Sequence, residues 1–180
     1  MTELRSRALL TAAALTALAL TGCSMTESDE PKIEGTRSVD AVDAEAKRIS
    51  SQVLDIIAVK GEVSEPGPGV GTCAGLDRDK YFTVRHPWSL TAATDAELAQ
   101  AMTRLKEGLP EQGWKITQYG RNNSPAKSLE LTADHTGKKF GVNVEFWEKG
   151  TSGNDNPPSL VVTVVSGCFQ VPEGEKVKHY

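Results

Sequence analysis

Two segments of the chain repeat apolar residues at intervals of three and four, the spacing that lines one face of an α-helix. The apolar positions of the first segment are Val39, Val42, Ala46, Ile49, Val53 and Ile56. Ser38 or Asp40 is placed to cap its start, and Gly61 is placed to end it. The second segment opens with Thr94–Glu97, which has the type and spacing of a capping box. Its apolar positions are Leu98, Met102, Leu105 and Leu109. The pattern predicts two amphipathic helices, the second ending near residues 110–113.

Other segments alternate apolar and polar residues with a period of two, as a strand with one buried face does. Residues 129–133 and 140–147 alternate in this way, on either side of a turn at 135–137. Residues 81–86 and 114–119 have the composition of strands, and residues 160–165 are apolar on both sides, as in the centre of a sheet. The pattern predicts an α+β domain, in which an antiparallel sheet of about five strands has both helices on one face.

The amino-terminal residues follow a different pattern. Arg5 and Arg7 precede an uncharged run, residues 8–20, which suits the apolar region of a secretory signal and is too short to span a bilayer. The run ends in Leu20-Thr21-Gly22-Cys23, which resembles the lipobox of bacterial lipoproteins. In that family the cysteine receives a diacylglycerol, and cleavage makes it the first residue of the mature chain. The alternative is an uncleaved signal anchor with an ordinary cysteine.

The lipobox resemblance implies a lipoprotein held on the extracytoplasmic face of the cell membrane by acyl chains on Cys23, palmitate among them. Two or more such chains hold a protein stably at a membrane. We therefore expect a signal peptide at 1–22, a flexible tether at 23–37, a single α+β domain at 38–172 and a disordered tail at 173–180.

Charge narrows the range of partners. The 180 residues include 20 Lys and Arg against 24 Asp and Glu, a formal net charge of −4. No basic cluster interrupts this balance, so we expect no binding to nucleic acid and no membrane contact other than the acyl chains. The exported part is long enough for one ordinary hydrophobic core.

Three cysteines are present, and the lipobox accounts for Cys23. Cys73 and Cys168 remain as an even pair in an oxidising compartment, which favours one disulfide. A redox pair is the competing interpretation, but such pairs are usually close in sequence, as in C-x-x-C. A nucleophilic cysteine would need a placed histidine, and the positions of His86, His135 and His179 do not favour one.

The order of these features resembles the LppA-type lipoproteins of mycobacteria and their actinobacterial relatives. Those chains pair a cysteine after the first helix with one in a closing T/S-G-C-x-x-P motif. Here the closing element is residues 166–172, SGCFQVP, in which proline comes one residue later, and Cys73 is not followed directly by glycine. The resemblance spans about residues 39–172. It implies a surface-anchored domain whose activity is unassigned, and it transfers no catalytic residue.

Motifs for enzymatic chemistry are absent from the sequence. It has no H-E-x-x-H, no G-x-S-x-G and no phosphate-binding G-x-x-x-x-G-K. Its three histidines lack the spacing of metal ligands. We expect no catalytic residue, no metal and no cofactor.

One surface remains as a candidate for binding. In three of the predicted strands, a few aromatic and basic residues have the opposite parity to the apolar ones, and these are Tyr81, Arg85, Lys115, Tyr119 and Trp147. Tyrosine, tryptophan and arginine are enriched in recognition surfaces. The alternative is a solvated sheet face without function, since antiparallel sheets often leave one face wet and strands favour Tyr, Trp and Thr.

Two functional hypotheses follow. The first is a lipid-anchored, non-enzymatic binding or accessory domain of the cell envelope, whose ligand or partner the sequence does not name. The second is an envelope-modifying hydrolase or transferase whose site, built of acids and a histidine, is assembled by the fold. An enzyme of this kind needs a pocket lined by histidine or paired carboxylates within hydrogen-bonding reach.

Overall fold

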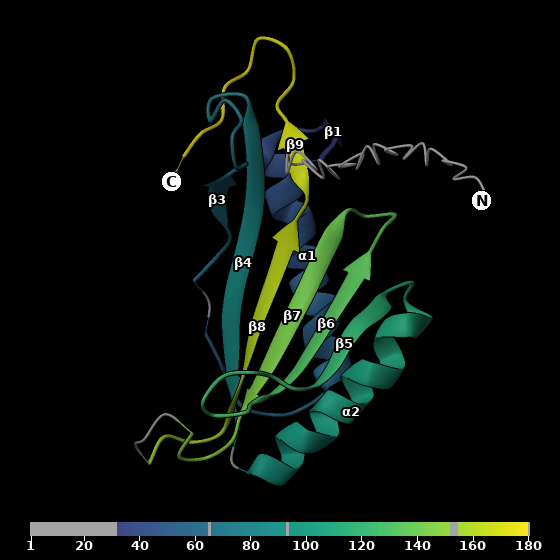
Figure 1. The fold of residues 1–180 in the computed structure, drawn as a ribbon, viewed down its shortest axis with the longest axis vertical. Helices are drawn as coiled ribbons and strands as arrows, with labels where there is room; N and C mark the ends of the chain where they lie inside the picture. The colour runs from purple at the N-terminus through teal and green to yellow at the C-terminus, as the bar shows by residue number, and fades with distance from the viewer. Residues whose placement is uncertain (1–31, 65, 93, 152–154, 180) are drawn as a thin grey trace, which may run out of the picture.

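The computed structural model describes residues 32–64, 66–92, 94–151 and 155–179. Helices α1 (Val39–Ile57) and α2 (Asp95–Glu111) pack against each other and share one hydrophobic core with inward-facing side chains of the sheet. In Figure 1, α1 lies behind the strands. The predicted α+β class and both predicted helices are confirmed.

The helix ends follow from local hydrogen bonding. Ser38, not Asp40, caps α1, because its side chain accepts the Ala41 N–H at 3.3 Å. The capping box of α2 is complete: the Glu97 N–H donates to Thr94 Oγ1 at 3.3 Å, and the Thr94 N–H donates to Glu97 Oε2 at 3.1 Å. These capping hydrogen bonds provide acceptors for backbone N–H groups at the start of each helix, which have no acceptor within the helix itself.

The sheet has nine strands in the described residues, so the predicted number of about five is an underestimate. They are β1 (Ile33–Thr36), β2 (Glu62–Val63), β3 (Gly69–Thr72), β4 (Tyr81–Thr91), β5 (Lys115–Arg121), β6 (Leu129–His135), β7 (Phe140–Trp147), β8 (Ser159–Ser166) and β9 (Cys168–Gln170). The order is β1-β9-β4-β8-β7-β6-β5, with β2 and β3 also paired to β4. The sheet is mixed, because β1 pairs with β9 in parallel while the other pairs are antiparallel.

The strands absent from the prediction are the short ones. β1, β2, β3 and β9 contain two to four residues each, too few to display an alternation. β1 also lies inside the segment predicted to be a flexible tether, where it pairs with β9. The predicted tether and the observed structure therefore overlap at 33–36, because pairing to a partner strand orders a segment that has little to bury.

Strand β4 continues five residues beyond the predicted end at His86. Pro87 does not stop it, because β4 pairs with β8 on one side there, while on its other side β3 pairs only as far as Arg85 and β2 begins at Leu90. A proline is tolerated where its missing N–H points away from a neighbouring strand. β4 thus runs along much of the sheet and pairs with four other strands.

The carboxyl-terminal residues also differ from the prediction. The segment 173–180 was expected to be a disordered tail, yet Val177 is buried in the core and its N–H donates to the Asp79 carbonyl at 2.9 Å. The Val171 N–H donates to the Lys80 carbonyl at the same distance. An apolar side chain and a backbone pairing hold this segment over the start of β4, at least as far as Val177.

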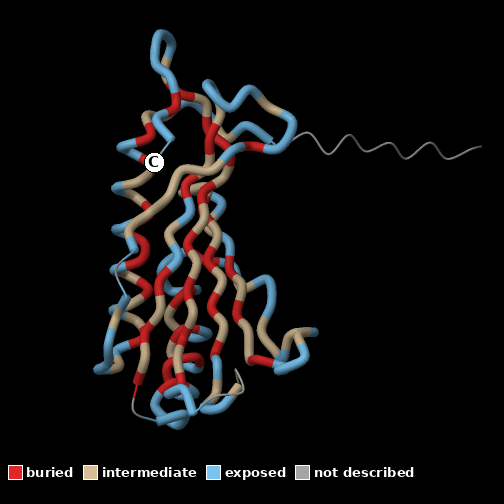
Figure 2. The backbone as a smooth tube through the Cα atoms, turned by 90° about the vertical axis from the view of Figure 1, so that its left-hand side faces the viewer, coloured by how far each residue is buried: buried red, intermediate tan, exposed pale blue. Residues whose placement is uncertain are grey.

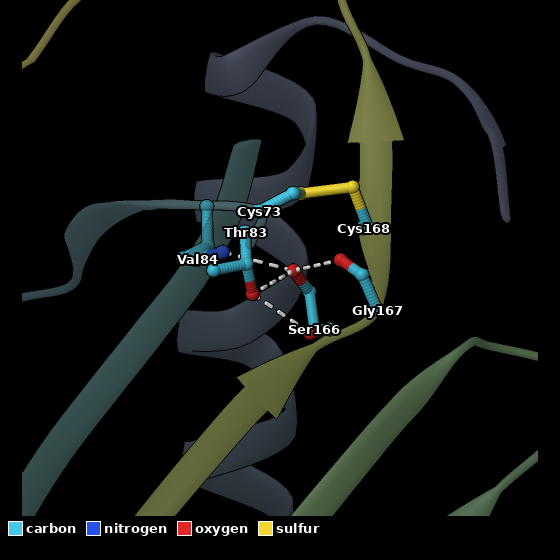
Figure 3. The surroundings of a disulfide bond; sticks show 6 residues. All are labelled: Cys73, Thr83, Val84, Ser166, Gly167 and Cys168. Carbon is cyan, nitrogen blue, oxygen red and sulfur yellow. Dashed lines mark hydrogen bonds between the residues drawn. A yellow bond between two sulfur atoms is a disulfide. The ribbon is translucent and has the colours of Figure 1, made fainter. Parts of the chain in front are cut away.

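The predicted disulfide between Cys73 and Cys168 is present, with the two Cα atoms 6.0 Å apart. It joins the loop after β3 to the first residue of β9 (Figure 3). Beside it, buried Ser166 compensates for the break between β8 and β9: its Oγ accepts the Val84 N–H at 2.9 Å and donates to the Gly167 carbonyl at 2.8 Å. A Cβ on Gly167 would lie 2.7 Å from Glu34 Cγ, so a larger residue here would require the Glu34 side chain of β1 to shift.

Candidate functional site

The sheet face opposite the helices can be followed in rows, because each strand pair has a defined register. The central strands alternate buried and partly exposed residues along their length, as Figure 2 shows by colour. One row of partly exposed positions joins Arg85 through Val165, Gly141 and Asp134 to Lys115. Another row, at the far end of the strands, joins Thr91 through Ser159 to Trp147.

The residues that the sequence suggested as one binding face lie in different rows or far apart within one row. Arg85 and Lys115 share a row, but four strand spacings lie between them, about 19 Å. The row of Trp147 meets β4 at Thr91, six residues beyond Arg85, which is about 20 Å along the strand. Tyr81 lies at the opposite end of β4, where it pairs with Gln170 of β9. The candidate residues therefore do not form one constellation.

Tyr119 is not on this face, and its predicted position is wrong. The register of β5 against β6 shifts between Ile116 and Gln118, so Tyr119 pairs with Leu131, whose side chain is in the core. The Tyr119 ring packs against the core, and Lys106 Nζ of α2 lies 4.6 Å from the ring centroid. A bulge adds one residue to a strand, and one residue is enough to send every later side chain to the other face.

Arg85 is exposed and lies beside the glycine-rich strand β3, where it pairs with Gly69. A hollow of about 560 Å³ is present here, lined mainly by residues 66–71 and closed by Arg85 and Pro87. Lys115 is exposed at the start of β5. Neither side chain is in contact with another of the suggested residues.

Trp147, in contrast, lines two hollows in the protein surface. Its side chain is 40% exposed, and only Ile33 is a comparably exposed large apolar residue in the described part of the chain. It lines a hollow of about 440 Å³, called the Trp147 hollow here, together with Ser124, Pro125, Ala126, Ser128, Glu145 and Thr151. A smaller hollow of about 230 Å³ on its other side is lined by residues that include Thr91 and Pro157.

Hydrogen bonds fix the walls of the Trp147 hollow. Trp147 Nε1 donates to Glu145 Oε2 at 3.1 Å, which orients the indole ring. In the loop between β5 and β6, Asn122 Oδ1 accepts the Ser124 N–H at 3.1 Å, forming an Asx turn. Arg121 donates to the Lys127 carbonyl at 3.0 Å and pairs with Glu148 at 2.9 Å, joining this loop to the end of β7.

Two carboxylates lie on neighbouring strands near the Trp147 hollow, and one of them, Glu145, lines it. Glu130 and Glu145 are direct partners across β6 and β7. Asn143 and Gln118 donate to Glu130, and Trp147 donates to Glu145, but neither carboxylate has an ion-pair partner among the described residues. The hollow itself therefore presents the Glu145 carboxylate beside an exposed aromatic ring, and Glu130 lies directly across from it on β6.

A second pocket, of about 340 Å³, lies between α1 and the edge of β4. Ser50 of α1 and His86 of β4 meet in it, with Ser50 Oγ 2.8 Å from His86 Nδ1. Burial lowers the pKa of His86 from its ordinary value of 6.5, and a hydrogen bond with the Ala46 carbonyl and the charge of Asp43 oppose that shift only in part. His86 is therefore a neutral imidazole near pH 7. Among the described residues, this Ser50–His86 pocket is the one place where a histidine ring is hydrogen-bonded to a side-chain hydroxyl.

Sequence reasoning missed this pocket, although a signal was present. His86 has the same parity as Phe82 and Val84, so it belongs to the buried side of β4. Ser50 follows Ile49 within the apolar stripe of α1 and is itself buried. The alternation within 81–86 already places His86 on the buried side of the strand, and extending it through Pro87 would have added Trp88 to that side.

Cys23, the proposed lipidation site, lies outside the described residues. Neither described helix is long and apolar enough to cross a membrane. Within the part of the chain that the structure describes, no group of three or more His, Cys, Asp or Glu side chains is arranged to hold a metal ion.

No protein-family model matches the chain, and no curated protein or solved structure matches it either. Its function is therefore inferred from its own residues and their geometry.

Proposed function

We propose that this protein is a lipid-anchored, extracytoplasmic binding domain of the cell envelope that holds its partner at the Trp147 hollow. The observation that supports this most is an exposed, hydrogen-bonded tryptophan that lines two hollows. An orienting hydrogen bond lowers the entropy cost of binding, because the ring is already held in one conformation. Fully desolvated tryptophans are among the side chains that contribute most to interfaces.

The charge around the hollow indicates what the partner presents. Glu145 lines the hollow and accepts the indole N–H, Glu130 lies directly across from it on β6, and neither carboxylate has a cationic partner among the described residues. A Lys or Arg side chain of the partner would pair with these carboxylates and lie against the ring face, where cation–π attraction contributes about 0.5–2 kcal/mol. We therefore propose a partner protein that inserts a basic side chain into the hollow.

The position of the hollow suits an anchored protein. The described chain begins at β1, beside β9 and the start of β4, whereas Trp147 aligns with the end of β4 (Figure 1). From Phe82 to Thr91 the strand extends about 30 Å. Nine residues lie between Cys23 and Ile33, so a lipid on Cys23 would keep β1 within about 36 Å of the bilayer. The Trp147 hollow lies at the end of the sheet farther from β1.

Site-specific photo-crosslinking tests this function in intact cells. A photoreactive residue at Thr151, in the wall of the hollow, is compared with one at Ala44, which is exposed on α1. We expect a discrete crosslinked partner from position 151 and none from position 44, and we expect the crosslink to weaken when the salt concentration is raised. Identical products from both positions would contradict the proposal.

One observation favours the second hypothesis, an envelope-modifying hydrolase or transferase. The 2.8 Å contact between Ser50 Oγ and neutral His86 has the distance of a nucleophile and its general base. A fluorophosphonate probe tests it directly: an enzyme of this kind is labelled at Ser50, and the label is lost in His86→Gln. An unlabelled protein would rule out this mechanism.

A further inference from the structure

The hollow of about 560 Å³ beside β3, called the β3 hollow here, has a floor of bare backbone. Three glycines line it at intervals of two residues, Gly67, Gly69 and Gly71. Gly69 and Gly71 pair directly with Arg85 and Thr83 of β4, and directly paired residues of a sheet point to the same face. The glycines therefore leave the open face of β3 without side chains, next to the Arg85 side chain.

Gly69 is not required by the conformation of β3. Its φ lies outside the left-handed region, and a Cβ added there would meet no atom within 4 Å. A larger residue would therefore fit this position without strain. A glycine inside a strand often marks a place where a ligand or another backbone approaches closely, and the open space over Gly69 is available for such an approach.

Strand β3 also has a free edge. In the described residues it pairs only with β4, and in Figure 1 it lies on the outer side of that strand. The Val84 N–H donates to Ser166 Oγ on the opposite side of β4, so Val84 turns its backbone groups away from β3. In an antiparallel pair, the residue opposite such a position also turns its backbone groups outward. That residue is Val70, whose N–H and C=O therefore point to the free edge.

Arg85 supplies the charge of the β3 hollow. Its guanidinium is exposed and forms no hydrogen bond or ion pair with another described residue. The remaining lining includes apolar surface from Pro66, Pro68 and Pro87, and no described acidic residue is part of it. An unpaired guanidinium over an apolar lining favours a carboxylate, with which arginine forms two parallel hydrogen bonds.

The geometry of the sheet lets a carboxylate reach Arg85 from an added strand. A strand paired to the free edge of β3 would lie two strand spacings, about 9.5 Å, from β4. A side chain opposite Gly69 would point to the same face as Arg85. Because Gly69 has no side chain, a glutamate at this position would pass over it to the guanidinium.

We propose that β3 binds an extended segment of a partner protein as an added edge strand, and that an acidic side chain of this segment crosses Gly69 to pair with Arg85. Main-chain hydrogen bonds to Val70 supply affinity, and the β3 hollow selects the acidic side chain. The row of Trp147 meets β4 about 20 Å along the strand from Arg85. This surface is therefore independent of the Trp147 hollow, and either proposal can fail without the other.

Fluorescence anisotropy of a dye-labelled peptide tests the proposal, with the full-length protein in detergent. The probe is the end-blocked peptide Ser-Thr-Val-Glu-Val-Thr-Lys, which has one glutamate among strand-forming residues. One control peptide replaces the glutamate with glutamine, and a second carries N-methyl groups on both valines, which removes their main-chain donors. We expect saturable binding of the probe and binding about tenfold or more weaker for each control, the effect of losing a strong hydrogen bond.

Two pairs of variants locate the binding. Gly69→Leu fills the space over β3, whereas Gly120→Leu adds the same side chain at an equally open glycine of β5. Arg85→Gln removes the guanidinium, whereas Lys115→Gln removes an exposed cation at the far end of the same row. Probe binding should weaken about tenfold or more in Gly69→Leu and Arg85→Gln, and it should stay at the wild-type level in the two controls.

Several results would overturn the proposal. They are the absence of saturable binding, equal affinity for the probe and either control peptide, and unchanged binding in Arg85→Gln or in a folded Gly69→Leu variant. Arg85→Gln decides the test if Gly69→Leu does not fold, because it changes only an exposed side chain. Sedimentation of the protein alone tests another occupant: a dimer that Gly69→Leu dissociates would place a second copy on β3 and contradict an acidic partner segment.

Discussion

The disulfide gives the most quantitative prediction for stability. Cys73 and Cys168 are 95 residues apart in sequence, so their bond closes a loop that includes most of the domain. The chain-entropy model assigns a cross-link of this length about 4.7 kcal/mol, and native bonds in small secreted domains are worth about 2–5 kcal/mol. We therefore expect the Cys73→Ser/Cys168→Ser double variant to lose about 2–5 kcal/mol of unfolding free energy.

Guanidinium denaturation of the oxidised wild-type protein and of the double variant measures this loss. The slope of unfolding free energy against denaturant should rise in the variant, because an unfolded chain without the cross-link exposes more surface. Reduced wild-type protein is the control and should match the variant, since both lack the bond. A loss below about 1 kcal/mol, with an unchanged slope, would refute the idea that the bond acts by restricting the unfolded chain.

Three further predictions concern single side chains. Ser166→Ala should cost about 1–3 kcal/mol of unfolding free energy, because it removes the acceptor of the buried Val84 N–H; a urea titration measures this, and an unchanged midpoint would contradict it. The pKa of His86 is lowered in the folded state, so as the pH falls the imidazole is protonated in the unfolded chain before it is protonated in the folded one. The contribution of His86 to the free energy of unfolding should therefore be present above about pH 6.5 and decline below it. His86→Gln should flatten this decline between pH 5 and 7, and an unaltered pH profile would show that another group causes it. Cys23→Ser should abolish lipid labelling and leave an uncleaved precursor, whereas mass spectrometry of an unmodified Cys23 in the mature wild-type protein would refute the anchor.

The parts of the fold that could be predicted are the helices and strands that are long enough to show a periodic pattern of apolar residues. The stripe of α1, the capping box of α2 and the alternation of β6 and β7 each extend over several residues with one consistent partner surface. The disulfide was predictable because only two cysteines remain once Cys23 is assigned to the proposed lipobox. In these places, local pattern and tertiary environment agree.

The features of the fold that could not be predicted depend on which strands pair and in which register, and no local sequence pattern indicates that pairing. The bulge near Thr117 leaves no mark in composition, yet it turns Tyr119 from the open face to the core. β1 and β9 contain few residues, and each is defined by its partner. The candidate site was predictable only for individual residues such as Trp147. Its environment comes from a loop between β5 and β6, a cross-strand carboxylate pair and the register of β7, all of which are long-range features.

The central claim, that Trp147 anchors a partner, is tested most directly by partner retention in Trp147→Ala. Ile33→Ala is the matched control, because Ile33 is equally exposed and lies on β1, at the other end of the sheet. Both variants should keep the wild-type melting temperature, since each removes an exposed side chain. The partner crosslinked from position 151 is quantified after isolation of this protein from detergent-solubilised envelope. We predict that Trp147→Ala reduces its recovery about tenfold or more, the effect of losing an interface anchor, and that Ile33→Ala leaves it unchanged. Equal recovery with Trp147→Ala and wild type would contradict the account.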